Sequence, residues 1–182
     1  MINDFYRKEI EPMLPDTILD FHTHLWKRDQ WINTRVGLSP SAGYMVTEPE
    51  YSDASLMEDG HSCFYNKQYN AVCFGQPSPV VDTDRTNEYI SSAAKSNPRI
   101  FPLMVTGGGL LPPSVLEDRL ISGGFLGYKV YLPWIGNDYG KVRVEDMLTP
   151  DEAEVGAKMR VPTLEGDVEL YVPASTASGR IR

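Results

Sequence analysis

Four short apolar segments alternate with segments of helical pattern, and this alternation restricts the fold more than any other feature. Each apolar segment is bounded by proline, glycine or polar residues, as strands of a buried sheet are; they cover residues 17–25, 69–75, 100–106 and 124–132. Helices are expected over residues 4–11, 52–59, 84–96 and 112–122. Alternating strands and helices predict right-handed crossovers and a parallel sheet, so we expect an α/β protein, either a doubly wound sheet or a (β/α) barrel.

The pattern changes near residues 152–156, where a fifth strand–helix unit fails to appear. Residues 158–161 and 168–172 are instead strand-like, and a turn signal from Pro162 to Gly166 separates them. We therefore expect a partial (β/α) domain at residues 1–153 and a short β-hairpin segment at 156–182. An isolated hairpin is marginally stable in water, so this one is expected to pack on the first part or on another chain.

Charge and composition exclude some classes of partner. The formal net charge is −8 and the basic residues are scattered, whereas nucleic acids and anionic membranes need a concentrated basic patch. The first residues lack the apolar core of a signal peptide, and no window approaches the roughly 18 apolar residues of a membrane span. Cys63 and Cys73 are ten positions apart, which fits two reduced thiols. We expect a cytoplasmic protein without nucleic-acid or membrane partners.

Two of the three histidines, His22 and His24, end the first expected strand. Residues two apart on a strand point the same way, so Asp20, His22 and His24 are expected to share one face. Two imidazoles at this spacing can chelate a divalent ion, and the carboxyl ends of parallel strands are where sites form. The alternative is a pair of histidines that are hydrogen-bonded in the core or solvated. His61 precedes the second strand and is expected to face solvent.

The segment ILDFHTHLW, residues 18–26, resembles the D-x-H-x-H first strand of the amidohydrolase-related superfamily, and LGYKVYLPWIGNDYGKVRVEDMLTPDE, residues 126–152, is similar to the fourth strand and following loop of its members. The resemblance covers about residues 16–153. It implies a TIM-like barrel in which His22 and His24 bind zinc or another divalent metal. The implied activity is that of a metal-dependent hydrolase, in which metal-activated water attacks a small carbonyl or amide substrate.

The chain also departs from that family. A complete barrel has eight strands, whereas about four are expected here, so the fold class we expect is an incomplete TIM-like barrel followed by a hairpin. The metal ligands that the family carries on later strands have no counterpart, so no catalytic residue is assigned and activity of the chain alone stays an open question. The open edge of such a half-barrel predicts a homo-oligomer that covers it.

Three further residues are candidates for binding the substrate. Lys129 follows the fourth-strand pattern and is expected to position substrate, although in some superfamily members a modified lysine on this strand bridges two metals. Trp26 and Trp134 each come just after a strand, where they can line a substrate pocket or pack in the core. Asp82, Asp84 and Asp138 are expected in loops at the same end of the sheet, and Asp84 can cap the helix that follows it.

The last segment, residues 156–182, is similar to another family, the C-terminal substrate-binding domain of DnaJ-type co-chaperones. The similarity rests on VPTLEG at residues 161–166 and VPASTASG at residues 172–179. It implies recognition of extended apolar peptides by addition of a strand. Three functions therefore remain open: a metal-dependent hydrolase, a peptide-binding module, and a remnant without catalytic activity.

Overall fold

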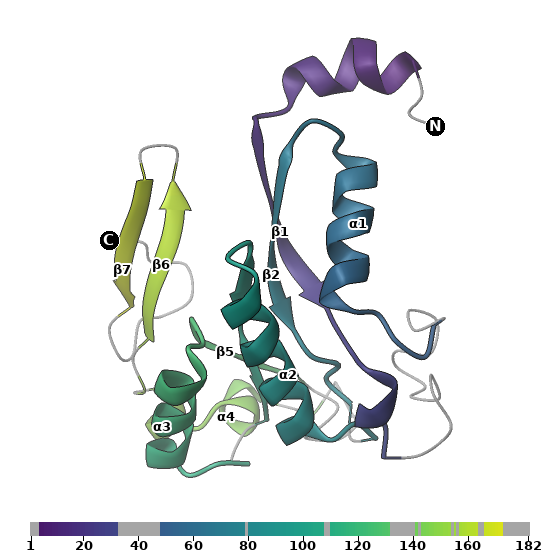
Figure 1. Cartoon of the computed structure of the whole chain (residues 1–182). Coiled ribbons are helices and arrows are strands. Elements are labelled where there is room, and N and C mark those ends of the chain that lie inside the picture. Colours follow the sequence, from purple (N-terminus) through teal and green to yellow (C-terminus); the bar gives the residue numbers. More distant parts are fainter. Residues whose placement is uncertain are drawn as a thin grey trace.

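The computed structural model describes residues 4–32, 48–78, 80–107, 110–131, 141, 143–153, 155, 157–163 and 166–172. A helical segment, Tyr6–Ile10, continues as a 3-10 turn at Glu11–Met13 and leads into the first strand. Strands and helices then alternate, with a hairpin at the carboxyl end (Figure 1). The protein is a mixed α/β structure whose parallel strands form small sheets, which confirms the α/β class.

The parallel strands follow one another in chain order. β1 (Thr17–His24), β2 (Gln68–Phe74) and β3 (Ile100–Pro102) form one sheet, and β4 (Met104–Thr106) pairs with β5 (Tyr128–Val130). All three pairings are parallel. Only Leu103 separates β3 from β4: its N–H donates to the Cys73 carbonyl on the β2 side, and the next N–H, that of Met104, donates to Gly127 on the β5 side. No closed barrel is formed by the strands that the structure describes.

Three helices pack against the same face of these strands. α1 (Asp53–Cys63) and α2 (Thr83–Ser96) contribute Leu56, Ile90 and Ala93 to a core that also contains Ala71 and Cys73 of β2 and Ile100 of β3. α3 (Pro113–Gly123) packs Leu116 and Leu120 on Met104 of β4. Side chains alternate along a strand, so Ile100 and Met104, four residues apart, point to the same side. The Phe74 side chain lies on the opposite face of the sheet, which these three helices do not cover.

The helix boundaries correct one prediction. α2 begins one residue before the expected Asp84, and its N-cap is Asp82, whose carboxylate accepts a hydrogen bond from the Arg85 N–H. Asp84 instead forms an ion pair with Arg119 of α3. Asp82 is the N-cap in place of Asp84 because the helix starts at Thr83. The side chain of an N-cap residue accepts a hydrogen bond from the N–H of N2 or N3, and Asp82 is at the position that allows this. β5 is also much shorter than the strand expected over residues 124–132.

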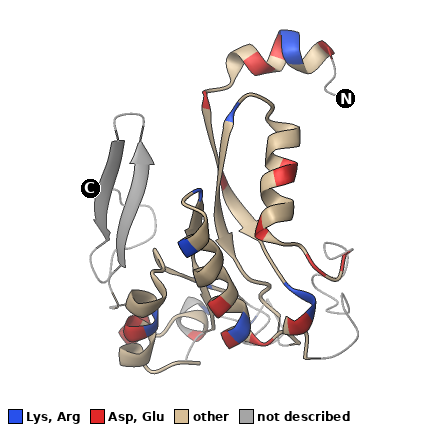
Figure 2. Ribbon diagram, viewed as in Figure 1, with Lys and Arg blue, Asp and Glu red and all other residues tan. Residues whose placement is uncertain are grey.

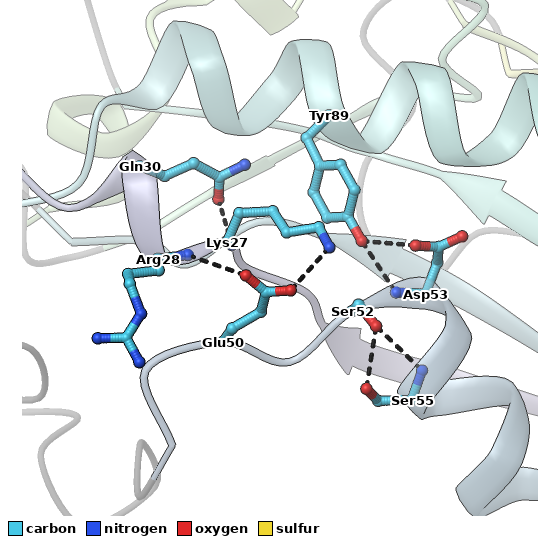
Figure 3. A network of polar contacts seen from close by, with 8 residues as sticks. All are labelled: Lys27, Arg28, Gln30, Glu50, Ser52, Asp53, Ser55 and Tyr89. Atoms are coloured by element: carbon cyan, nitrogen blue, oxygen red, sulfur yellow. Dashed lines mark hydrogen bonds and ion pairs between the residues drawn. The ribbon is translucent and has the colours of Figure 1, made fainter.

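Polar contacts link the two ends of the segment between β1 and α1, and another links α1 to α2. The segment contains a 3-10 turn at Arg28–Gln30, and residues 33–47 lie outside the described residues. Lys27 forms an ion pair with Glu50 at 2.8 Å, and the Tyr89 hydroxyl of α2 donates to Asp53 at 2.7 Å (Figure 3). The first contact joins the residues that follow β1 to those that precede α1. The second joins the first residue of α1 to α2.

The carboxyl-terminal hairpin was predicted in type and place. β6 (Ala157–Thr163) and β7 (Gly166–Val172) pair antiparallel in full register, from Ala157 with Val172 to Thr163 with Gly166. Two small helices, α4 (Val144–Met147) and α5 (Pro150–Ala153), precede it. The division into domains at residues 153 and 156 stays a prediction.

Charged residues of both signs are interspersed along the described elements (Figure 2). On the N-terminal helical segment, on α2 and on α3, positions of Lys or Arg lie on the same element as positions of Asp or Glu. Among the described residues, no helix has both the length and the apolar character needed to cross a membrane.

Candidate functional site

A β-bulge near the end of β1 decides which side chains reach the open face of the sheet. Asp20 pairs with Ala71 and Thr23 with Cys73, so Phe21 and His22 together lie opposite Val72. Asp20 is thereby left on the helix-covered face, where its carboxylate accepts hydrogen bonds from the Tyr69 hydroxyl at 2.9 Å and from the His22 N–H at 3.1 Å. The expectation that Asp20 shares a face with His22 and His24 is wrong, because the bulge shifts the alternation by one residue.

His22 and His24 do lie side by side, as the sequence predicts. Their ring centroids are 5.3 Å apart, and both rings pack edge-on against Phe74, at 5.1 and 4.5 Å. His24 is part-buried and its Nδ1 lies 3.0 Å from the Gly75 carbonyl oxygen. A carbonyl can only accept, so Nδ1 carries the proton and Nε2 keeps its lone pair. This is how protein metal sites commonly fix the tautomer of a histidine ligand.

Two residues at the end of β5 meet the histidine pair. The Lys129 Nζ lies 3.2 Å from Nδ1 and 3.3 Å from Nε2 of His22, and 4.0 Å from the centroid of the Phe74 ring. The Tyr131 hydroxyl lies 3.4 Å from Nε2 of His22 and 3.3 Å from Nε2 of His24. The site is thus built from β1, from β5 with its following residue, and from a floor supplied by β2.

Sequence reasoning found Lys129 but missed Tyr131 and Phe74. The signal for Tyr131 was present, because a residue two positions after Lys129 points to the same side of an extended segment. Phe74 is fully buried under the histidines and Lys129, at 0% exposure. Nothing in the sequence distinguishes it from an ordinary core residue, since its contacts come from segments more than 45 residues away.

Burial lowers the pKa of both imidazoles. For His24, burial is the largest cause, opposed by the Gly75 carbonyl and reinforced by His22 and Lys129, and its pKa falls from 6.5 to about 4. The pKa of His22 is lowered by burial and by the Lys129 charge. Burial also lowers the pKa of Lys129 and raises that of Tyr131. Both histidines are therefore neutral at pH 7, which is the form that binds a metal.

The His24 pKa predicts an acid-sensitive stability. Between pH 6.5 and about 4 the unfolded chain binds a proton at His24 that the folded protein does not, so the free energy of unfolding decreases as the pH falls through this window. The loss from this residue amounts to at most about 3 kcal/mol. Urea unfolding of the protein and of His24→Gln, measured at pH 7 and pH 4.5, should show a smaller loss in the variant. Equal losses would contradict the assignment.

A cavity of 540 Å³ lies between β1 and α1, on the helix-covered side of β1, and both histidines contribute to its lining. Trp26 contributes to its wall: the indole is buried at 7% exposure, donates from Nε1 to the Glu48 carbonyl and lies 5.5 Å from the Tyr51 ring. A volume of this size suits a small organic molecule. His22, His24, Asp20, Thr23, Tyr69 and Gln76 are among the other lining residues.

The remaining sequence candidates divide into those placed elsewhere and those not described. His61 is exposed on α1 and takes no part in the pair, as expected. Cys63 and Cys73 are free thiols, exposed and buried respectively. Trp134 and Asp138 lie outside the described residues.

The donors at the site fit a divalent cation in part. Two neutral imidazoles with one fixed tautomer are ligands that zinc prefers. Within the described part of the chain, however, no group of three or more His, Cys, Asp or Glu side chains comes together. The Lys129 ammonium group also repels a cation, so binding requires it to turn away or lose its proton. His22 and His24 therefore fit as two ligands of a metal whose other ligands must be of a different kind.

Comparison with known proteins leaves the family open. No family model matches the chain, and no solved structure matches it. A stretch of 60 residues, which makes up 32% of this chain, is 43% identical to part of the bifunctional protein HldE of Geotalea uraniireducens (strain Rf4). The match spans only 12% of that protein's length.

Proposed function

We propose that the chain is a metal-dependent hydrolase domain of the amidohydrolase-related type, built on an incomplete TIM-like barrel. His22 and His24 hold a divalent metal, most suitably zinc, and the substrate is a small carbonyl or amide compound. The observation that carries the proposal is the position of the two histidines: their ring centroids lie 5.3 Å apart at the carboxyl end of β1, on the open face, where Lys129 and Tyr131 meet them.

The arrangement of the strands supports a barrel over a doubly wound sheet. In a doubly wound sheet the strand order reverses and helices cover both faces, whereas here the order is sequential and α1, α2 and α3 share one face. In a flat sheet β1 and β5 would be about 14 Å apart, at about 4.8 Å per strand. The contact of Lys129 with His22 at 3.2 Å requires the open face to be concave.

Each residue has a role that follows from its surroundings. A bound divalent metal polarises a carbonyl group and lowers the pKa of water. His24 is held in its ligand tautomer by Gly75, and His22 is oriented by Phe74. Lys129 is placed to attract a carbonyl or carboxylate oxygen of the substrate, and Trp26 contributes an apolar wall to the cavity. A second copy of the chain is the partner proposed to cover the open edges of β1 and β5.

A second candidate function rests on the hairpin. Among the described strands, β6 and β7 pair only with each other, so their outer edges have free hydrogen-bonding groups. Such edges can accept an extended peptide as an additional strand. This peptide-binding module would use residues 156–182 and no metal, so it is independent of the histidine site.

The hydrolase proposal is tested by turnover. The zinc-loaded protein, assayed on a panel of small amides, lactones and esters, should hydrolyse at least one of them. Replacing a direct ligand in His22→Ala should lower kcat/KM at least about 100-fold, since even indirect partners of a metal ligand are worth 10- to 100-fold.

His61→Ala is the matched control, because it removes the one histidine that lies outside the site. It should retain full activity. A folded, zinc-loaded protein that hydrolyses no substrate faster than His22→Ala would contradict the proposal and favour the remnant.

A further inference from the structure

The Tyr131 hydroxyl lies close to the Nε2 atoms of both histidines. It lies 3.4 Å from Nε2 of His22 and 3.3 Å from Nε2 of His24. The Tyr131 ring is held beside His24 at 5.9 Å and beside Phe74 at 6.3 Å between centroids. The phenol oxygen is thus equidistant from two nitrogen atoms of the proposed ligands.

These distances are long for hydrogen bonds. Hydrogen bonds from a hydroxyl group have donor–acceptor distances centred near 2.7–2.8 Å, and a phenol has only one proton to donate. A single hydroxyl cannot donate to both imidazoles at once. The phenol oxygen can also accept, from a protonated Nε2 of His22, so the separations of 3.3 to 3.4 Å correspond to two long hydrogen bonds at most.

The same distances match the separation between ligands of a tetrahedral metal. Ligand atoms that lie at about 2.1 Å from a zinc ion at tetrahedral angles are about 3.4 Å apart from one another. An ion that contacts both Nε2 atoms can therefore also contact the Tyr131 oxygen while these two oxygen–nitrogen separations stay unchanged.

We propose that the Tyr131 hydroxyl is the third donor of a divalent-cation site whose other two donors are Nε2 of His22 and Nε2 of His24. The inference rests on the metal-binding part of the proposed function and names a ligand that it lacks. Tyrosine is outside the His, Cys, Asp and Glu set, no three of which come together within the described part of the chain.

Lys129 is compatible with this donor set once its ammonium group has turned away from Nε2 of His22 or lost its proton. When His22 Nε2 binds the cation, its Nδ1 carries the proton, and neither nitrogen can then accept from Lys129. The Phe74 ring offers the ammonium group an alternative, because Nζ already lies 4.0 Å from its centroid. The fourth coordination position stays free for water or substrate, as in catalytic zinc sites.

The test is Tyr131→Phe, which removes one oxygen and keeps the ring that packs against His24 and Phe74. Zinc affinity is measured by competition with a chromophoric chelator, and the visible absorption of bound Co²⁺ reports the coordination geometry. Tyr131→Phe should bind zinc at least about 10-fold more weakly, the lower limit for losing an indirect partner. Its Co²⁺ absorption should lose the intensity typical of tetrahedral coordination.

Tyr128→Phe is the matched control. Tyr128 lies on β5, three residues before Tyr131, and its hydroxyl donates to the Glu152 carbonyl at 2.8 Å, away from the histidines. This variant should bind zinc and Co²⁺ as the unmodified protein does. Equal zinc affinities in Tyr131→Phe and Tyr128→Phe would overturn the inference and leave the two-histidine site intact. Failure of the unmodified protein to bind zinc would overturn the metal site as a whole.

Discussion

Replacing Phe74 by alanine is expected to reduce the free energy of unfolding by about 3–5 kcal/mol. Phe74 is fully buried, and its ring supports His22, His24 and Lys129 from below. Removing it takes away the ring's transfer free energy and leaves a cavity that the surrounding strands fill only in part. Because domains are stable by only about 5–15 kcal/mol, this is a large fraction of the total.

Urea unfolding followed by circular dichroism measures the effect, and Phe21→Ala provides the comparison. Phe21 is on β1 within the bulge and is 68% exposed, so the same substitution there should change stability by no more than about 0.5 kcal/mol. Similar losses in the two variants would show that Phe74 is not the packed floor of the site.

The buried Phe74 ring explains why the site is both apolar and basic. His24 and Lys129 each rest on the Phe74 ring, and burial lowers the pKa of both. His24 is thereby neutral at pH 7. A cation that arrives from solvent then meets the Nε2 lone pair of His24 in place of a competing proton.

The sequence predicts the elements of this fold well and their pairing details poorly. The strands that contain His22, Phe74 and Val105, and helices α1 to α3, follow from apolar segments and turn residues in their own stretches of chain. The bulge does not, because it depends on how Phe21 and His22 align with Val72 on another strand. Local alternation therefore placed Asp20 on the wrong face.

The candidate site was predictable to a similar extent. The spacing of His22 and His24 is local and identifies the pair. Tyr131 reaches the pair only because the residue after β5 lies close to the end of β1, which depends on how the two parallel sheets are placed and not on the local sequence. The part of the cavity wall formed by Trp26 was not predictable from the local sequence either. It depends on the pairing of Trp26 with Tyr51, 25 residues later.

His24→Ala is expected to abolish zinc binding. Its Nε2 is the donor whose tautomer the Gly75 carbonyl fixes, and a single imidazole from His22 cannot hold the ion against water. The expected loss is complete at micromolar zinc, and unfolding measurements should confirm that the variant stays folded. His61→Ala should bind zinc as the unmodified protein does.

The direct measurement is the zinc content of the protein after equilibrium dialysis. The proposed site predicts about one equivalent bound by the unmodified protein and by His61→Ala, and less than about a tenth of an equivalent by His24→Ala. Binding of less than a tenth of an equivalent by the unmodified protein, or undiminished binding by His24→Ala, would contradict a metal site at the end of β1.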